Sequence, residues 1–199
     1  MELIRNVRIY GVRESIVASG YSMRTEPPTE EEFNELVDSL PEHHISRANR
    51  LSSNPIGSGH DNFLAGCVVQ FDLCFTVKVW TEAERYHFLQ FVNSMSSMHR
   101  LNKMDFDLIF CDYVAEGIKD IMRQLKANYN ENPTEENFLK LVYSCPVGLQ
   151  LTARMTTNYL QLKTIYSQRK NHRLPEWREF CEWIKSLPHS EFIIWSETE

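Results

Sequence analysis

The segment from Val68 to Val79, VVQFDLCFTVKV, constrains the fold of this chain more than any other. Its apolar side chains fall at every second position, at Phe71, Leu73, Phe75, Val77 and Val79. Because successive side chains of a strand point to opposite faces, this spacing predicts a β-strand with one apolar face. The shorter alternation over residues 7–10 predicts an earlier strand, so we expect the chain to build a sheet.

Other segments carry the signals of amphipathic helices. Thr29 is expected to cap a helix whose first turn is acidic and which Pro41 ends. Its buried stripe would be Phe33, Leu36, Val37 and Leu40. Further helices are expected over residues 14–22, 80–98, 113–128, 134–144, 150–168 and 176–187. Residues 42–62 are expected to form a loop. Residues 107–110 are expected to form either a short strand or a helix, and residues 193–195 a short tail strand.

The composition is that of a globular chain of 199 residues, enough for one large domain or two small ones. A net charge of -6 argues against broad binding to nucleic acid or to an anionic membrane, which needs a surplus of Lys and Arg. The five cysteines are far apart and form no C-x-x-C pair, which indicates reduced thiols rather than a zinc or redox site. The N-terminus has no signal-peptide pattern, and no apolar run approaches the roughly 20 residues of a membrane span, so we expect a soluble, cytoplasmic protein.

The stretch RYHFLQFVNSMSSMHR, residues 85–100, is the first candidate site. Its polar side chains are mainly Arg, His, Asn, Gln and Ser, whereas a solvated helix face is normally rich in Lys and Glu. Arginine matches phosphate, and the neutral donors and histidine suit a planar ring. An amphipathic helix with a solvated face would also explain the pattern. The residues concerned are Arg85, His87, Gln90, Asn93, Ser94, Ser96, Ser97, His99 and Arg100.

Two weaker groups lie on either side of this stretch. The turn at residues 57–62 contains Gly57, Gly59 and His60, where glycines let a backbone approach a ligand closely. Taken by itself, this segment is better explained as an ordinary flexible turn with a surface histidine. Towards the C-terminus, Arg169 and Arg173 would lie one turn apart on a continuing helix and could face one anion. A basic helix end that complements the helix dipole is the simpler explanation there. A metal site at His43, His44 and His60 is rejected, because no Asp, Glu or Cys partner has ligand spacing.

Taken in chain order, these groups resemble the motifs of the flavin-dependent thymidylate synthases. That family has Gly-His-x-Ser-Pro-x-Glu-His before a strand, and this chain has Gly59-His60 through Ala65-Gly66 before CVVQFDL. The family signature R-H-R-x(2)-S-x-N-E-x-S-x-R-Y is similar, with shifted spacing, to the stretch from Arg85 to Arg100. Its C-terminal pattern of a proline, a helical Asn, an Arg eleven positions later, then His and Trp corresponds to Pro146, Asn158, Arg169, His172 or Arg173, and Trp177.

The resemblance implies an α/β (α+β) fold, a small sheet packed with several helices, in one domain over residues 1–199. It also implies a homotetramer with flavin adenine dinucleotide (FAD) between subunits. The reaction would methylate deoxyuridine monophosphate, with methylenetetrahydrofolate as carbon donor and a nicotinamide cofactor as reductant of the flavin. By the same resemblance, flavin would contact His60, Arg85, His87 and Asn158. The nucleotide phosphate would bind Ser94, Ser96 and Arg100, and Arg173 would be a further substrate contact. Arg169 would polarise the pyrimidine.

Several family positions differ in this chain. Tyr86 stands where the signature has His, Ser94 where it has Glu, and Ala65-Gly66 where the earlier motif has Glu-His. A site that loses polar contacts changes substrate or stops reacting. The alternative hypothesis is therefore a non-catalytic nucleotide-binding or scaffold protein that kept the fold. A helical nucleic-acid binder is a third possibility, disfavoured by the acidic charge.

Overall fold

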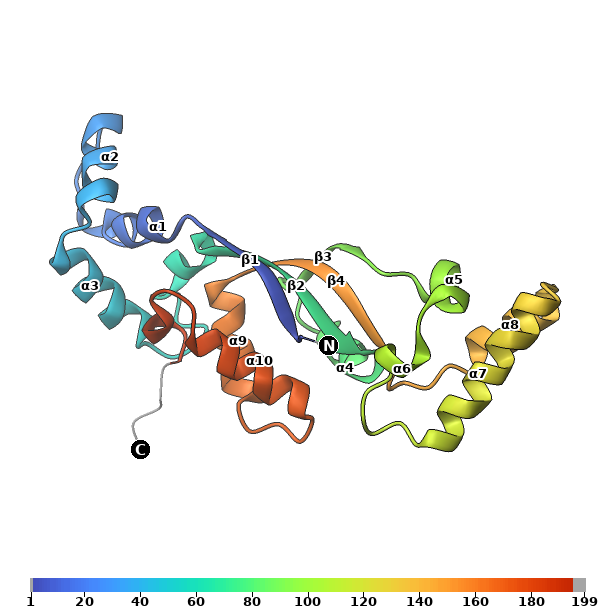
Figure 1. Cartoon of the computed structure of the whole chain (residues 1–199). Coiled ribbons are helices and arrows are strands. Elements are labelled where there is room, and N and C mark those ends of the chain that lie inside the picture. Colours follow the sequence, from blue (N-terminus) through green and yellow to red (C-terminus); the bar gives the residue numbers. More distant parts are fainter. Residues whose placement is uncertain (1, 195–199) are drawn as a thin grey trace. The chain divides into compact units, whose positions relative to one another are not determined.

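A computed structural model, which describes residues 2–194, shows a mixed α/β protein built on a four-stranded antiparallel sheet (Figure 1). The strand order is β1-β2-β4-β3, so β1 and β3 form the edges. The strands are β1 (Ile4–Tyr10), β2 (Val68–Thr76), β3 (Gln90–Ser94) and β4 (Gln150–Asn158). The predicted fold class is confirmed, and so are both strands expected from alternation. Among the described residues, no helix is both long and apolar enough to cross a membrane.

The described residues divide into two compact units. Unit 1 comprises residues 2–5, 72–85 and 91–155, and unit 2 comprises residues 6–71, 86–90 and 156–194. Each strand has residues in both units. The single domain expected for residues 1–199 remains a prediction.

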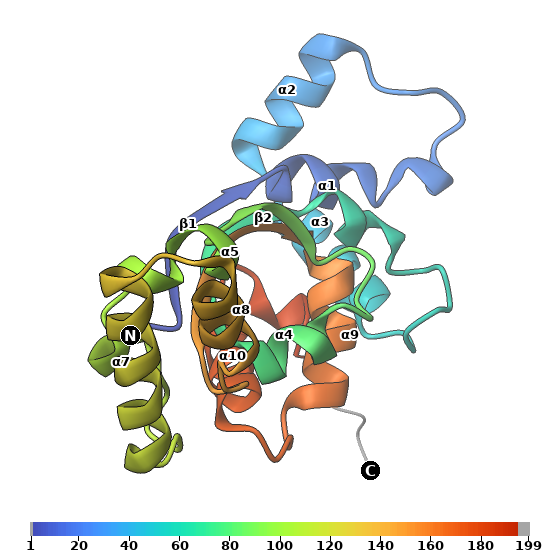
Figure 2. The ribbon, with the colours of Figure 1, turned by 90° about the vertical axis from the view of Figure 1, so that its right-hand side faces the viewer.

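Unit 1 has its own apolar core beneath a helical hairpin. The hairpin is formed by α7 (Glu116–Glu131) and α8 (Glu135–Tyr143), which lie side by side in both views (Figures 1 and 2). The other helical segments of the unit are α4 (Val77–Ala83), α5 (Ser97–Arg100), η3 (Leu101–Lys103) and α6 (Phe106–Ile109). The core consists of Leu101, Met104, Phe106, Ile109, Phe110, Val114, Met122, Leu141 and Leu149.

Unit 2 packs helices around an aromatic core. Phe71 lies 4.7 Å from Trp183 and 5.9 Å from Phe180, measured between ring centroids. Such clusters contribute both buried area and favourable ring geometry. The helical segments of the unit are α1 (Val12–Ala18), η1 (Tyr21–Met23), α2 (Glu30–Ser39), α3 (Glu42–Ser52), η2 (Asn62–Gly66), α9 (Tyr159–Arg169), α10 (Pro175–Lys185) and η4 (Ser190–Phe192).

Side-chain caps start several of these helices. The hydroxyl of Thr29 accepts a hydrogen bond from the backbone N–H of Glu32, which confirms the predicted cap of α2. Thr134 caps α8 in the same way through the N–H of Asn137. These bonds satisfy N–H groups that have no partner within the helix. The helices predicted near residues 29–40, 113–128, 134–144 and 176–187 are confirmed within a few residues.

Several predicted elements, and the end of one predicted strand, are wrong. The strand expected to reach Val79 ends at Thr76, whose side chain caps α4. The helix expected over residues 80–98 ends at Ala83, and the edge strand β3 follows it. The helix expected over residues 150–168 is β4 as far as Asn158 and only then α9. The loop expected over residues 42–62 contains α3, whose buried stripe of His44, Ala48 and Ser52 is too polar and small to stand out in the sequence. Residues 107–110 are mainly helical, and Ile193 and Ile194 are not in a strand; Trp195 lies outside the described residues.

Candidate functional site

Helix α9 is the centre of the polar structure in unit 2. Apolar, amide and charged side chains are buried around its axis rather than on one face. Its buried polar side chains contact segments that are distant in the sequence. Two of these segments, around Asp61 and around Tyr86, carry predicted site residues. The buried residues of α9 are Tyr159, Gln161, Leu162, Lys163, Ile165 and Arg169.

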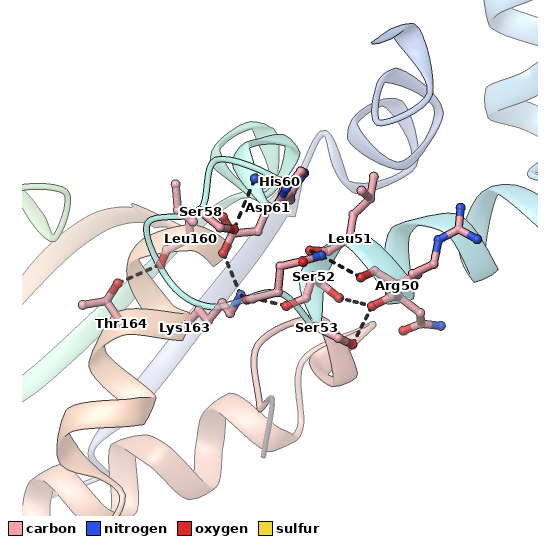
Figure 3. A network of polar contacts seen from close by, with 12 residues as sticks. Arg50, Leu51, Ser52, Ser53, Ser58, His60, Asp61, Leu160, Lys163 and Thr164 are labelled. Carbon is pink, nitrogen blue, oxygen red and sulfur yellow. Dashed lines mark hydrogen bonds and ion pairs between the residues drawn. The ribbon is translucent and has the colours of Figure 1, made fainter. Parts of the chain in front are cut away.

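Lys163 and Asp61 form a fully buried ion pair (Figure 3). The Nζ of Lys163 lies 2.6 Å from Oδ2 of Asp61, and each side chain is 1% exposed. The same ammonium donates to the carbonyl oxygens of Ser52 at 2.7 Å and Asn54 at 2.9 Å. A lysine ammonium has three donors, so these three acceptors match its capacity. The contacts tie the end of α3 and the base of the Gly57–His60 turn to α9.

The turn itself projects from this anchor. Gly57 and Gly59 adopt positive φ values of 85° and 79°, a conformation that glycine adopts without strain. Residues 56–60 are exposed, including the imidazole of His60. His60, a predicted flavin contact, therefore lies at the tip of a loop whose base is buried.

Arg169 is buried in an aromatic cage. Its Nε donates to the hydroxyl of Tyr86 at 2.7 Å, and its guanidinium carbon lies 4.8 Å from the ring centroid of Trp177 and 5.5 Å from that of Tyr86. The Tyr86 hydroxyl in turn donates to Oε1 of Gln168 at 3.0 Å. Cation–π contacts of this kind strengthen when water is excluded. The cage fixes the cation in one orientation.

The segment after Tyr86 is also held by α9. The backbone N–H of Phe88 donates to Oε1 of Gln161 at 3.3 Å, and the N–H of Leu89 donates to the carbonyl of Tyr86 at 2.9 Å. Tyr86 and Leu89 are buried, whereas His87 between them is exposed. This arrangement presents His87 on a rigid turn.

Asn158 and Arg173 occupy the two ends of α9. The side chain of Asn158 caps the helix, since its Oδ1 accepts from the N–H of Gln161 at 2.9 Å. Arg173 is exposed in the turn after the helix, which ends at Arg169. The expectation that Arg169 and Arg173 lie on one continuing helix is wrong, because the chain turns at Lys170 to Leu174 before α10 begins.

The remaining predicted residues lie in unit 1. Arg85 follows α4 and is exposed, and Ser94 is exposed at the end of β3. The side chain of Ser96 caps the short helix α5, accepting from the N–H of His99 at 3.3 Å. Arg100 ends that helix and is exposed, while its N–H donates to the carbonyl of Ser96 at 3.2 Å. The backbones of Ser96 and Arg100 are thus close together on this one-turn helix.

Ser94 also lines a hollow of about 320 Å³ between α4 and the strands β3 and β4 in unit 1. Two of its walls are the rings of Trp80 and Phe91, whose centroids are 4.9 Å apart. Trp80 is fixed by a 3.1 Å hydrogen bond from Nε1 to the carbonyl of Leu151. The lining contains the carboxylate of Glu84 but no Lys, Arg or His. Its chemistry suits an uncharged ring better than a phosphate.

Comparison with solved structures identifies the fold. Over 99% of this chain and 99% of the other, the structure superposes on the flavin-dependent thymidylate synthase ThyX of Helicobacter pylori complexed with FAD and dUMP, with a TM-score of 0.72 at 13% sequence identity. A second structure of that protein, also with FAD and dUMP, gives 0.73 at 14% identity over 99% and 98% of the two chains. No protein-family model and no curated protein matches the sequence.

The chain has the fold of flavin-dependent thymidylate synthase. The resemblance of the sequence motifs to that family is thereby matched by a similarity of the whole fold. Identities of 13% and 14% leave the role of each residue to be argued from this chain alone.

One departure from the family motif lies at a close packing contact. Gly66 stands where the motif has His, and a Cβ atom there would lie 2.4 Å from Oγ of Ser15 on α1. A Cβ on Gly11 would in turn lie 2.5 Å from the carbonyl oxygen of Gly66. A side chain at position 66 would therefore meet the hydroxyl of Ser15, which would have to move.

The residues that the sequence analysis missed are mostly the supports of the candidate site. Tyr86 was noted only as a replacement for histidine, and Asp61, Gln161, Lys163 and Gln168 were not singled out. Lys163 stands in the run YLQLKTI, where a lysine amid apolar residues indicates a buried, partnered charge. The buried thiols are not candidates, because burial raises the pKa of Cys67 to about 11 and that of Cys181 to about 12.

Proposed function

We propose that this protein binds FAD and a pyrimidine deoxynucleotide and acts as a flavin-dependent thymidylate synthase-like enzyme. The observation that carries the proposal is the match of the whole fold to an enzyme whose structure holds FAD and dUMP. The chain's own Arg, His and Ser side chains at the motif positions support it.

The residues of unit 2 fit a flavin. His60 and His87 are exposed donors on anchored turns, and both suit the diphosphate or ring edge of FAD. By the family resemblance, Arg85 is also proposed as a flavin contact, and its exposed guanidinium matches phosphate. Asn158 would take part through groups other than the Oδ1 that caps α9. When bound, reduced FAD supplies a hydride.

Arg169 is the proposed catalytic residue. Electrostatic stabilisation of a pyrimidine needs a cation that is already fixed where negative charge develops. Tyr86 and Trp177 provide such fixation, and the exposed fraction of Arg169 is only 7%. In a site with little water, a fixed cation acts more strongly than one in solvent.

The nucleotide phosphate would bind beside the short helix α5. Arg100 supplies the charge, and Ser96 and Ser94 supply neutral hydroxyls. Arg173 is a further exposed cation for the substrate. Methylenetetrahydrofolate and a nicotinamide cofactor complete the proposed set of small-molecule partners.

The protein is proposed to act as a homo-oligomer, a homotetramer by analogy with the family. The edge strand β3 exposes all five of its residues. Phe91, Val92, Met95 and Met98 in unit 1 are between 41% and 57% exposed. Apolar side chains at this density commonly mark a protein interface, and they flank the residues proposed to bind phosphate. A second copy of the chain is the proposed occupant.

The residue assignments are tested by titrating FAD and dUMP into variants. Arg169→Ala and Arg100→Ala are each expected to weaken dUMP binding by about tenfold or more, because Arg169 is assigned to the pyrimidine and Arg100 to the phosphate. Arg8→Ala, which removes an exposed guanidinium on β1, is the control and is expected to change neither affinity. Near-ultraviolet circular dichroism shows that each variant is folded. Unchanged FAD and dUMP affinities in folded Arg169→Ala would show that the C-terminal assignment is wrong.

A second candidate function is nucleotide binding without methylation of the nucleotide. It is favoured by motif positions at which this chain's residues serve a structural role. The side chain of Ser96 and the Oδ1 of Asn158 cap helices, and position 66 is a glycine packed against Ser15. Incubation with dUMP, methylenetetrahydrofolate, FAD and reduced nicotinamide cofactor separates the two. Formation of thymidine monophosphate supports the enzyme, and binding of FAD and dUMP without product supports the second candidate.

A further inference from the structure

The loop from Ser52 to Asp61 is closed at its base by one ammonium group. Lys163 contacts the carbonyl oxygens of Ser52 and Asn54 and the carboxylate of Asp61, all within 2.9 Å. Figure 3 shows the lysine side chain reaching from α9 toward Ser52 and Asp61, with His60 adjacent to Asp61 in the chain. The two ends of the loop are therefore fixed to the same atom.

The base of this loop is buried, whereas its tip is exposed to solvent. Asp61, Ser52 and Lys163 are each about 1% exposed, whereas residues 56–60 are exposed. Hydrogen bonds at the tip run between near neighbours: from the N–H of Ser58 to the carbonyl of Pro55, from the N–H of His60 to Oγ of Ser58, and from the N–H of Asn62 to the carbonyl of Gly59. Two glycines add conformational freedom. The buried base therefore restricts where this exposed tip can lie, and His60 is the tip residue directly next to the anchored Asp61.

A buried ion pair is poor evidence for stability, since apolar residues of similar volume often replace one at no cost. Such a pair specifies geometry better, because its partners fit in only one arrangement. An apolar replacement could keep α9 packed while leaving the loop free to adopt other conformations.

From this geometry we infer that Lys163 is a positioning residue: through Asp61 and the two carbonyl oxygens it holds the Gly57–His60 turn in the conformation that presents His60 to FAD. The inference rests on the proposed function for its ligand. The anchoring of the turn is a property of this chain and can be measured without flavin.

The test compares a double variant with a matched control. Lys163→Met with Asp61→Leu removes both buried charges together, so neither is left unpaired. Asp61→Asn is a second variant, which retains an oxygen acceptor for Lys163 but leaves the buried ammonium without a carboxylate. The control, Lys140→Met, breaks the exposed pair between Lys140 and Glu136, whose side chains are 56% and 76% exposed.

Amide hydrogen exchange is measured over residues 53–61, with α10 as the internal reference. In the double variant, exchange of the loop is expected to rise about tenfold or more while exchange of α10 stays as in the wild type. The FAD dissociation constant is expected to rise about tenfold, and that of dUMP, which is assigned mainly to residues of unit 1, by less than about twofold. Lys140→Met should change none of these values.

Each alternative result has one meaning. Unchanged loop exchange, or an equal rise in α10, overturns the anchoring. A local rise in exchange with unchanged FAD affinity overturns the link from Lys163 through His60 to flavin, while the proposed function stands. Wild-type protein that binds no FAD overturns the proposed function, and a local rise in exchange in the variant then still supports the anchoring of the turn.

Discussion

The Nε of Arg169 donates a 2.7 Å hydrogen bond to the hydroxyl of Tyr86, and both residues are buried. Tyr86 stands where the family signature has histidine. A tyrosine hydroxyl can accept from the guanidinium and donate to Gln168 at the same time, as it does here. The replacement therefore joins the first candidate segment to the last through one oxygen atom.

Tyr86→Phe should destabilise the protein by about 2 kcal/mol, because the buried Nε–H of Arg169 loses its acceptor. Denaturant unfolding measures this change. Tyr113→Phe serves as the control, since Tyr113 is 84% exposed, and should lie within about 0.5 kcal/mol of the wild type. A Tyr86→Phe variant as stable as this control would show that the bond contributes nothing.

Gly66→Ala should be destabilising by roughly 1–3 kcal/mol, because the added methyl group meets Oγ of Ser15. The same substitution in a Ser15→Ala background should cost less than half as much. Ser15 also hydrogen-bonds Cys67, so the interaction energy is taken from a double-mutant cycle rather than from single variants. Strictly additive effects would contradict the close packing of α1 on η2.

His44 should make the stability of the protein fall on acidification. Burial lowers the pKa of His44, and the positive charges of Arg47, His43 and Arg24 add to the effect. Arg47 donates to Nδ1 of His44 at 2.8 Å and also to carbonyl oxygens at the end of α1. Because the unfolded chain binds the proton more tightly, this contribution is present above the ordinary pKa of 6.5 and is lost as the pH falls through that value.

His44→Gln is therefore expected to flatten the loss of thermal stability between about pH 7.5 and about pH 5.5. His43→Gln, at an exposed position on the same helix, should leave the pH profile close to that of the wild type. An identical profile in His44→Gln and the wild type would rule out His44 as the group responsible.

Helix ends and one strand were predictable from the sequence because their signals are local. Thr29, Thr134 and the alternation from Val68 to Thr76 work through neighbours only a few residues away. Strand β4 carried a signal that was missed: Ala153, Met155 and Thr157 are buried at every second position, in a threonine-rich run typical of strands. Strand β3 had none, because all five of its residues are exposed and no alternation results.

The candidate site was predictable only in part, for a related reason. Functional side chains such as His60 and Arg100 stand out by residue type, whereas their supports are ordinary residues made important by long-range contacts. Lys163 lies 102 positions from Asp61, and Arg169 lies 83 positions from Tyr86. No local sequence pattern identifies the distant partner in such a pair. They follow from the packing of α9 against its neighbours.

Titration of the wild-type protein with FAD is the most direct test of the central claim. The account predicts saturable binding near one FAD per chain, seen as a shift in the visible absorption of the flavin and quenching of its fluorescence, together with retention of the yellow colour on gel filtration. Protein that stays colourless and leaves the flavin spectrum unchanged at saturating FAD, in the presence and absence of dUMP, would contradict it.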